Sequence, residues 1–135
     1  MFLALFPLSS LWGQAQEYPS KNITVIIGYA PGGGADAPAR YFAQKLAVFA
    51  GKPVIVENRQ GALTNIAAEA VARAKPDGYT AFITSGNSTM AANPHLFKDL
   101  TWDPVKDFTP VSTLYQIPFI LLVNPKTPAH SVSES

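Results

Sequence analysis

The sequence predicts an α/β fold in which a mostly parallel sheet is flanked by helices. The first observation is that three segments rich in β-branched and aromatic residues span residues 22–29, 52–57 and 79–84. The second is that a segment with helical periodicity lies between each pair of them. This β-α-β-α-β order implies parallel strands joined by right-handed crossovers. The uninterrupted apolar run in residues 22–29 suits a strand whose sheet is covered on both faces.

The helices follow from the spacing of apolar residues. Phe42, Leu46 and Phe49 recur at helical spacing after the first strand, and Gly51 is placed to end that helix. The second helix is rich in alanine and is marked by Ile66, Ala67, Ala70, Val71 and Ala74. Further along the chain we expect a short helical segment over residues 89–92 and a last apolar strand over residues 117–123.

Composition indicates a globular chain and excludes several kinds of site. The 135 residues are 47% hydrophobic and 14% charged, which is typical of one folded domain and not of a disordered chain. A net charge of +1, with both signs interspersed, gives no reason to expect a nucleic-acid partner. The absence of cysteine excludes disulfides, thiolate catalysis and cysteine-based zinc sites. His95 and His130 lie far apart without an obvious third ligand, so we expect no metal site.

Both ends of the sequence carry signals about the whole protein. Residues 2–12 are mainly apolar but are fewer than the roughly 20 that span a membrane. Gly13-Gln14-Ala15 follows with small residues where a signal peptidase reads, so we predict a signal peptide over residues 1–15. Its basic region is incomplete, because no Lys or Arg precedes Lys21; the alternative is a buried N-terminal segment. Residues 127–135 resemble a loop and the first turn of a helix, so we expect a longer protein.

The most informative segment is the loop between the first strand and the first helix. Gly32, Gly33 and Gly34 allow the backbone to turn sharply and to approach a ligand closely. The following helix directs its positive end and its unpaired N–H groups toward the same place, which favours an anion. We expect main-chain donors from Gly33 and Gly34, and Asp36 as the helix N-cap. The alternative is that the glycines only form a tight turn.

Two further polar loops follow the other predicted strands. Ligands of open parallel sheets bind outside the C-terminal ends of the strands. Residues 30–36, 58–65 and 85–88 all lie at such ends and are rich in Gly, Ser, Thr or Asn. We therefore expect these three loops to converge on one site, with side-chain hydrogen bonds from Ser85 and Ser88.

A dinucleotide site is the rival hypothesis for the glycine loop. Gly32-x-Gly34-x-x-Ala37 fits the G-x-G-x-x-A pattern, and Glu57 ends the second strand where a ribose-binding acid is expected. That arrangement predicts a dinucleotide-dependent oxidoreductase. Against it, Asp36 places a carboxylate beside the pyrophosphate, and Pro38 removes an N–H group from the first helical turn.

Five motifs in order resemble the substrate-binding proteins of tripartite tricarboxylate transporters, the Bug family. They are Tyr18-Pro19-Ser20-Lys21 and the segments 29–36, 54–59, 74–80 and 103–108. The resemblance implies a periplasmic receptor with the two-lobed type II binding-protein fold. Residues 16–112 would then form part of the first lobe, and residues 113–135 a hinge strand and the truncated start of the second. Such a receptor captures a small carboxylate for membrane transporter subunits; we expect no reaction, no cofactor, and a monomer when full-length.

The resemblance also implies a set of ligand-binding residues in the three loops. They are Tyr29, Ala30, Gly32, Gly33, Gly34, Asp36, Gly61, Ala62, Asn65, Ser85, Gly86 and Ser88. The chain departs from the family at Leu63 and Thr64, which stand where family members usually have glycines. Arg59 is open to two interpretations, as a bidentate clamp on a carboxylate or as a surface residue.

Overall fold

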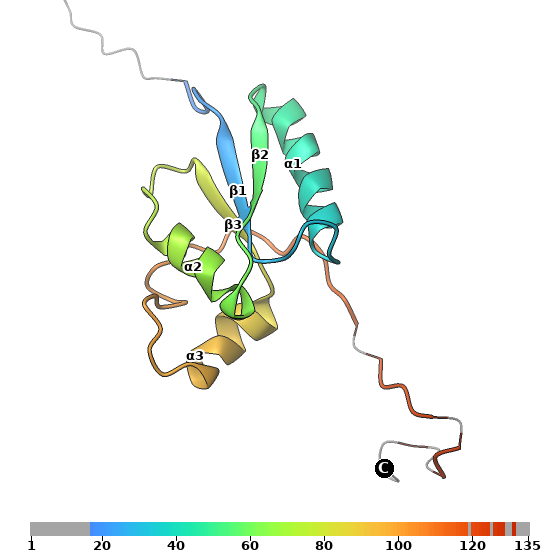
Figure 1. Cartoon of the computed structure of the whole chain (residues 1–135). Helices are drawn as coiled ribbons and strands as arrows, with labels where there is room; N and C mark the ends of the chain where they lie inside the picture. The colour runs from blue at the N-terminus through green and yellow to red at the C-terminus, as the bar shows by residue number, and fades with distance from the viewer. Residues whose placement is uncertain (1–16, 119, 125, 129–130, 132–135) are drawn as a thin grey trace, which may run out of the picture.

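A three-stranded parallel sheet forms the centre of the computed structural model, which describes residues 17–118, 120–124, 126–128 and 131. The strands are β1 (Ile23–Ile27), β2 (Val54–Asn58) and β3 (Thr80–Ile83), in the order β2-β1-β3 (Figure 1). The predicted parallel arrangement is therefore confirmed. Ile27 at the end of β1 pairs with Asn58 on one side and with Ile83 on the other. All three strands consequently end at one edge of the sheet.

The central strand supplies the core because it has a neighbouring strand on each side. Val25 and Ile27 are 2% and 0% exposed, and together with Ala39 they form the buried cluster. Partly buried side chains of both outer strands pack against this cluster, namely Val54, Val56, Ala81 and Ile83. The outer strands remain only half-covered. The uninterrupted apolar sequence of β1 thus reflects its central position.

Helix α1 (Asp36–Ala50) packs on β1 and β2, and helix α2 (Asn65–Ala72) packs on β3 and β1 (Figure 1). Gly51 ends α1 with a φ of 63°, as predicted, because glycine adopts this left-handed conformation without a Cβ penalty. The buried stripe of α1 consists of small residues, Ala39 and Ala43, which allow the helix to approach the sheet closely.

The predicted apolar face of α1 is therefore not its buried face. Leu46 and Phe49 are exposed, Phe49 by 91%, and Phe42 is half-buried. These three side chains line an open groove beside the sheet and do not pack into the core. Helical spacing identified the apolar stripe correctly, but the alanine stripe lies beside it and packs on the sheet in its place.

The segment after β3 is more helical than its sequence indicates. A π-helix, η2 (Gly86–Ala92), runs directly into α3 (Asn93–Leu96), so the short helix predicted over residues 89–92 begins earlier and does not stop before Asn93. Most of the loop predicted over residues 85–88 belongs to η2. Pro94 does not interrupt the helix, because it lies in the first turn of α3 where its missing N–H group is not needed.

The strand predicted over residues 117–123 is wrong for the described part of that segment. Residues 111–118 and 120–124 have no regular secondary structure, and Ile117 and Leu122 are 69% and 85% exposed. Figure 1 shows this part of the chain leading away from the sheet. An apolar run forms a strand only when another strand pairs with it, and none of the described strands does so here. The predicted signal peptide lies outside the described residues.

Gly28, which follows β1, lies very close to Thr64, and this contact provides a test of the fold. A Cβ atom built on Gly28 lies 2.4 Å from the Cβ and 2.9 Å from the Cα of Thr64. We expect Gly28→Ala to lower the free energy of unfolding by about 1–3 kcal/mol through overpacking, as measured by urea denaturation.

Gly86→Ala is the matched control, because a Cβ built there meets nothing within 4 Å. This second substitution is expected to be neutral or to stabilise by up to about 1 kcal/mol. Equal losses of stability in both variants would show that the contact between Gly28 and Thr64 is not tight.

Candidate ligand-binding site

The three loops expected to form the site leave the sheet at the same edge. β1 leads into the glycine loop (residues 28–35), β2 into residues 59–64, and β3 into Ser85 and η2. Because Ile27, Asn58 and Ile83 lie side by side, the loops begin next to one another. Parallel pairing thus provides the common edge that the sequence predicts.

The glycine loop is held by its own hydrogen bonds, which leaves few free donors. The N–H group of Gly33 donates to Ala30 O at 3.0 Å, and that of Asp36 donates to Gly33 O at 2.9 Å. Gly33 is therefore not the free main-chain donor that was predicted. Within the described part of the chain, the N–H groups of Gly34 and Ala35 donate no hydrogen bond. These two groups, at the positive end of α1, are available to an anion.

Asp36 does not cap α1, contrary to the prediction. It is the first helical residue, and the N-cap position is occupied by Ala35, which makes no side-chain capping bond. The buried Asp36 carboxylate accepts hydrogen bonds from Arg40 Nε at 2.9 Å, Asn58 Nδ2 at 2.8 Å and Gly32 N at 3.0 Å. These bonds, with that from Arg40 contributing most, hold the pKa of the carboxyl group well below its ordinary value.

Asn58 extends this network to the end of β2. Its Nδ2 also donates to Tyr29 O at 3.0 Å, and its Oδ1 accepts from Arg40 Nη2 at 2.9 Å. Asn58 and Arg40 are thus positioning residues that the sequence did not identify. The only available signal was the i,i+4 spacing of Asp36 and Arg40, which is typical of a helical ion pair. Because the buried Asp36 carboxylate accepts three hydrogen bonds within the protein, it holds the glycine loop in place.

The second loop contains a left-handed turn, η1 (Ala62–Thr64), formed by residues other than glycine. Ala62, Leu63 and Thr64 have φ values of 46°, 51° and 72°. Asn65, a predicted ligand contact, is buried, and its Oδ1 accepts a hydrogen bond from Asn93 Nδ2 at 2.8 Å. Gly61 and Ala62 have no side chain that hydrogen-bonds, so any hydrogen bond to a ligand there comes from the main chain.

The position of Arg59 supports its interpretation as a surface residue and not as a clamp on a ligand carboxylate. Its Nη2 lies 2.9 Å from Glu57 Oε2, and its side chain is 47% exposed. The guanidinium is therefore directed to a neighbouring carboxylate of the same strand end. The Glu57 carboxylate, which the dinucleotide hypothesis requires for the ribose, is therefore already paired with Arg59.

The third loop contributes hydroxyl groups. Ser85 Oγ donates to Asn87 Oδ1, and Asn87 Oδ1 also accepts from Ser88 N at 2.7 Å. The Ser88 side chain is exposed, and its hydroxyl makes no hydrogen bond to any described residue. Asn87, which is not among the predicted site residues, therefore orients the Ser85 hydroxyl group and the main chain of Ser88.

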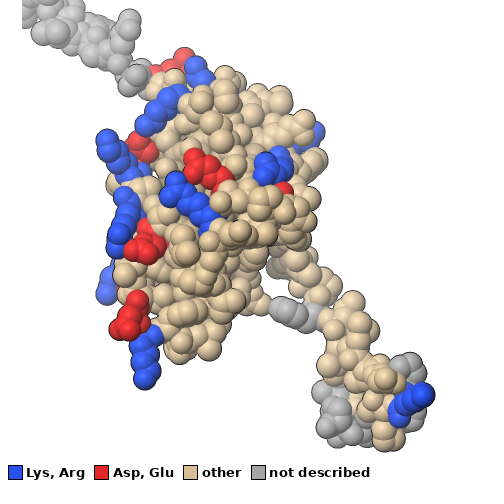
Figure 2. Space-filling model, in the orientation of Figure 1, with Lys and Arg blue, Asp and Glu red and all other residues tan. Residues whose placement is uncertain are grey.

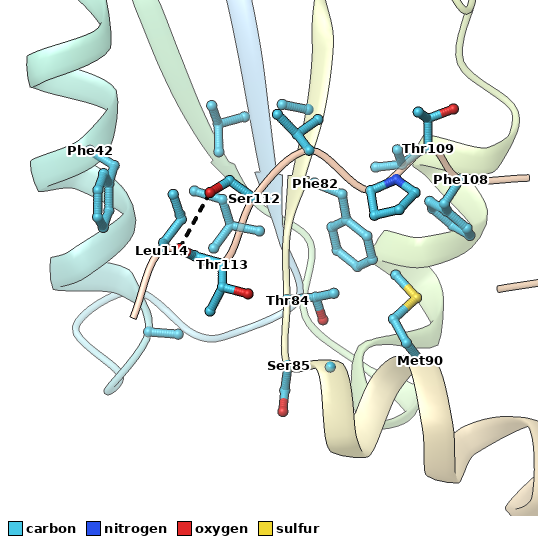
Figure 3. A pocket seen from close by; sticks show the side chains of 18 of the residues that line it. Phe42, Phe82, Thr84, Ser85, Met90, Phe108, Thr109, Ser112, Thr113 and Leu114 are labelled. Carbon is cyan, nitrogen blue, oxygen red and sulfur yellow. Dashed lines mark hydrogen bonds between the residues drawn. The ribbon is translucent and has the colours of Figure 1, made fainter. Parts of the chain in front are cut away.

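An open groove brings part of the predicted site together. Four of the predicted site residues line it together with Ala35, namely Tyr29, Gly34, Ser85 and Gly86. Figure 3 shows Phe42 of α1 on one side, Phe82 and Met90 on the other, and the segment through Ser112 and Leu114 between them. Its volume of about 2380 Å³ exceeds the 300–1,000 Å³ or so of ordinary small-molecule sites. The groove is thus an open surface. The predicted residues of the second loop (Gly61, Ala62 and Asn65) and Ser88 are not among the residues that line it.

Charges are mixed on the face shown in Figure 2, where Lys and Arg alternate with Asp and Glu. Several charged side chains of the described structure form pairs, such as Lys21 with Asp77 at 3.0 Å. This face therefore provides no field of one sign. The described residues contain no cluster of potential metal ligands and no helix long and apolar enough to cross a membrane. His95 is exposed, and His130 lies outside the described residues.

The Asp36 network predicts a pH-dependent contribution to stability. Because the folded-state pKa is lowered from 3.8, the contribution is fully present above about pH 4 and is lost as the pH falls below that value. We expect Asp36→Asn to be less stable than wild type in urea denaturation at pH 7, with the difference shrinking at pH 3.

Asp99→Asn is a suitable control, because Asp99 is exposed and makes no hydrogen bond within the described structure. Its stability should follow that of the wild type at both pH values. A loss in Asp36→Asn that is the same at pH 7 and pH 3 contradicts the network.

Comparison with known proteins agrees with this architecture. Residues 38–135 match the family described as the tripartite tricarboxylate transporter family receptor. A UPF0065 protein of Bordetella bronchiseptica is 38% identical over 130 residues, which cover 96% of this chain and 38% of that protein. The chain therefore spans little more than a third of the length of this relative.

Two solved structures share the fold. The Rhodopseudomonas palustris protein MatC with bound malate has a TM-score of 0.67 and 39% identity over 72% of this chain and 33% of its own. R. palustris Rpa4515 with adipate has a TM-score of 0.74 and 33% identity over 87% of this chain and 39% of its own. The resemblance seen in the sequence motifs is confirmed, and the chain belongs to the tripartite tricarboxylate transporter receptor family.

Proposed function

We propose that this chain is part of an extracytoplasmic receptor that captures a small carboxylate and delivers it to a tripartite tricarboxylate-type transporter. One observation carries the proposal: the N–H groups of Gly34 and Ala35 are unpartnered within the described structure, at the start of α1, and both residues line the groove at the strand-end edge. A carboxylate oxygen placed there accepts charge-assisted hydrogen bonds. Ser85 and Ser88 add hydroxyl groups from the third loop, and no reaction or cofactor is involved.

The solved relatives support a carboxylate over other anions. One holds malate and another holds adipate, which share two carboxyl groups and differ in the chain between them. We infer that this receptor binds an acid of the same chemical class in the periplasm, and that its partners are the membrane subunits of the transporter. We expect the full-length receptor to be monomeric and not to bind nucleic acid.

Binding strength requires more than this edge of the sheet. A helix end contributes only about 0.3–1 kcal/mol to an exposed anion, whereas micromolar affinity needs about −8 kcal/mol. Charge-assisted hydrogen bonds of about 1.5–3 kcal/mol each supply the difference only where water is excluded. Since the groove is open, we propose that the rest of the full-length receptor closes over it. These residues alone should bind the acid weakly.

The dinucleotide alternative has little support. The matching family is a transporter receptor family, and the two solved relatives hold malate and adipate, not a dinucleotide. The Gly32 N–H group donates to Asp36 and is not free for a pyrophosphate. Glu57 pairs with Arg59, so its carboxylate already has a partner where a ribose hydroxyl is needed.

Removing one amide donor tests the proposal. Ala35→Pro deletes the N–H group of Ala35 without breaking an internal hydrogen bond, and the φ of −95° at this position is near the range of proline. In the full-length receptor we expect the affinity for malate or adipate to fall by about tenfold or more, the value of one charge-assisted hydrogen bond. Isothermal titration calorimetry measures this change.

Ala35→Gly retains the N–H group and is the matched control, with an affinity expected to stay near wild type. NAD is titrated in parallel. Equal affinity of the proline and glycine variants would show that the Ala35 N–H group does not contribute to binding. Tight NAD binding that is abolished by Glu57→Ala would favour the oxidoreductase.

A further inference from the structure

The turn formed by Ala62, Leu63 and Thr64 has a backbone conformation that these residues rarely adopt. All three φ values are positive, between 46° and 72°. Side chains with a Cβ atom are disfavoured in the left-handed region, and consecutive examples are rarer still. Such a turn persists only when surrounding contacts hold it in place.

Two buried polar side chains supply those contacts. Asn93, 1% exposed, donates from Nδ2 to Leu63 O at 2.7 Å and to Asn65 Oδ1 at 2.8 Å. Thr89, 0% exposed, has its Oγ1 2.6 Å from Thr64 Oγ1 and accepts from Thr84 Oγ1 at 2.7 Å. These hydrogen bonds therefore hold Leu63 and Thr64 from the buried side of the turn.

The turn also lies next to the first loop of the site. Thr64 packs against Gly28 so closely that a Cβ on Gly28 would overlap it. The N–H groups of Ala62 and Leu63 donate no hydrogen bond within the described structure, and the side chain of Leu63 is 66% exposed. The buried side of the turn is thus bonded to the protein, while two of its amide donors remain unused.

We propose that Thr89 and Asn93 are positioning residues, which hold the left-handed turn in the conformation that contacts the ligand. This inference rests on the proposed carboxylate-binding function, because the turn includes Ala62 of the predicted site. The π-helix and α3 then act as a support for the second loop, since they carry both side chains. Ligand contact is made by the turn, not by Thr89 or Asn93 themselves.

The test uses the full-length receptor, with malate and adipate as probes. If Asn93 keeps Leu63 in the left-handed region, Asn93→Ala lowers the fraction of receptor with a competent turn, and affinity falls by about five- to fiftyfold. Glycine adopts this conformation without a Cβ penalty, so adding Leu63→Gly should restore affinity to within about threefold of wild type. If Asn93 only stabilised the fold, Leu63→Gly would not restore affinity, because the cavity left by Asn93→Ala would remain unfilled.

Thr89 is tested with a matched pair of variants. Thr89→Val removes the hydroxyl at nearly constant volume and should weaken binding, whereas Thr89→Ser retains the hydroxyl and should bind nearly as wild type. Thr101→Val, at an exposed threonine that makes no hydrogen bond within the described structure, controls for the substitution itself.

Backbone chemical shifts and three-bond couplings of residues 62–64 provide a readout that needs no ligand. These values should depart from those of a left-handed turn in Asn93→Ala. They should return to them in the double variant Asn93→Ala, Leu63→Gly. Unchanged affinity and couplings in Asn93→Ala and Thr89→Val overturn the inference, as does failure of Leu63→Gly to restore them. If the wild type binds neither acid, the proposed function fails, and the couplings alone then decide the positioning role.

Discussion

The buried carboxylate of Asp36 joins three elements at the edge where the strands end. It accepts hydrogen bonds from the glycine loop, from Arg40 on α1 and from Asn58 at the end of β2. A carboxylate in this setting is stable only because each of these donors compensates for its burial. The same bonds fix the position at which α1 begins. The free amide groups of Gly34 and Ala35 therefore owe their placement to a residue that does not itself face the groove.

A second polar cluster performs a similar role for the second loop. Thr64, Thr84, Thr89 and Asn93 connect this loop to the helical segment after β3 without using a charge. Because Gly28 has no side chain, Thr64 can approach the start of the glycine loop. Loops that are bonded on their inner side in this way present main-chain donors without the entropic cost of ordering them at binding.

The groove beside the sheet is open to solvent. Its apolar lining from α1, β3 and η2 remains accessible, although the chain between residues 109 and 118 runs along it (Figure 3). The free amide groups of Gly34 and Ala35 line this open groove, where water weakens any hydrogen bond that they donate. The chain covers little more than a third of the relatives described here, which is consistent with the proposal that other parts of the full-length receptor provide the enclosure.

The sequence by itself determined the parallel β-α-β-α-β order, the end of α1 at Gly51, the glycine loop and the family. These features depend on local periodicity, on backbone preferences of glycine and on motifs that are contiguous in the chain. Only the tertiary structure decided that Asp36 bonds to Asn58 in place of capping α1, that Gly33 is already bonded, and that alanines rather than Phe49 face the sheet. It also decided that the described part of residues 117–123 forms no strand. The physical reason is that hydrogen-bond partners and packing neighbours are chosen across many residues of sequence, whereas periodicity records only which side chains are apolar.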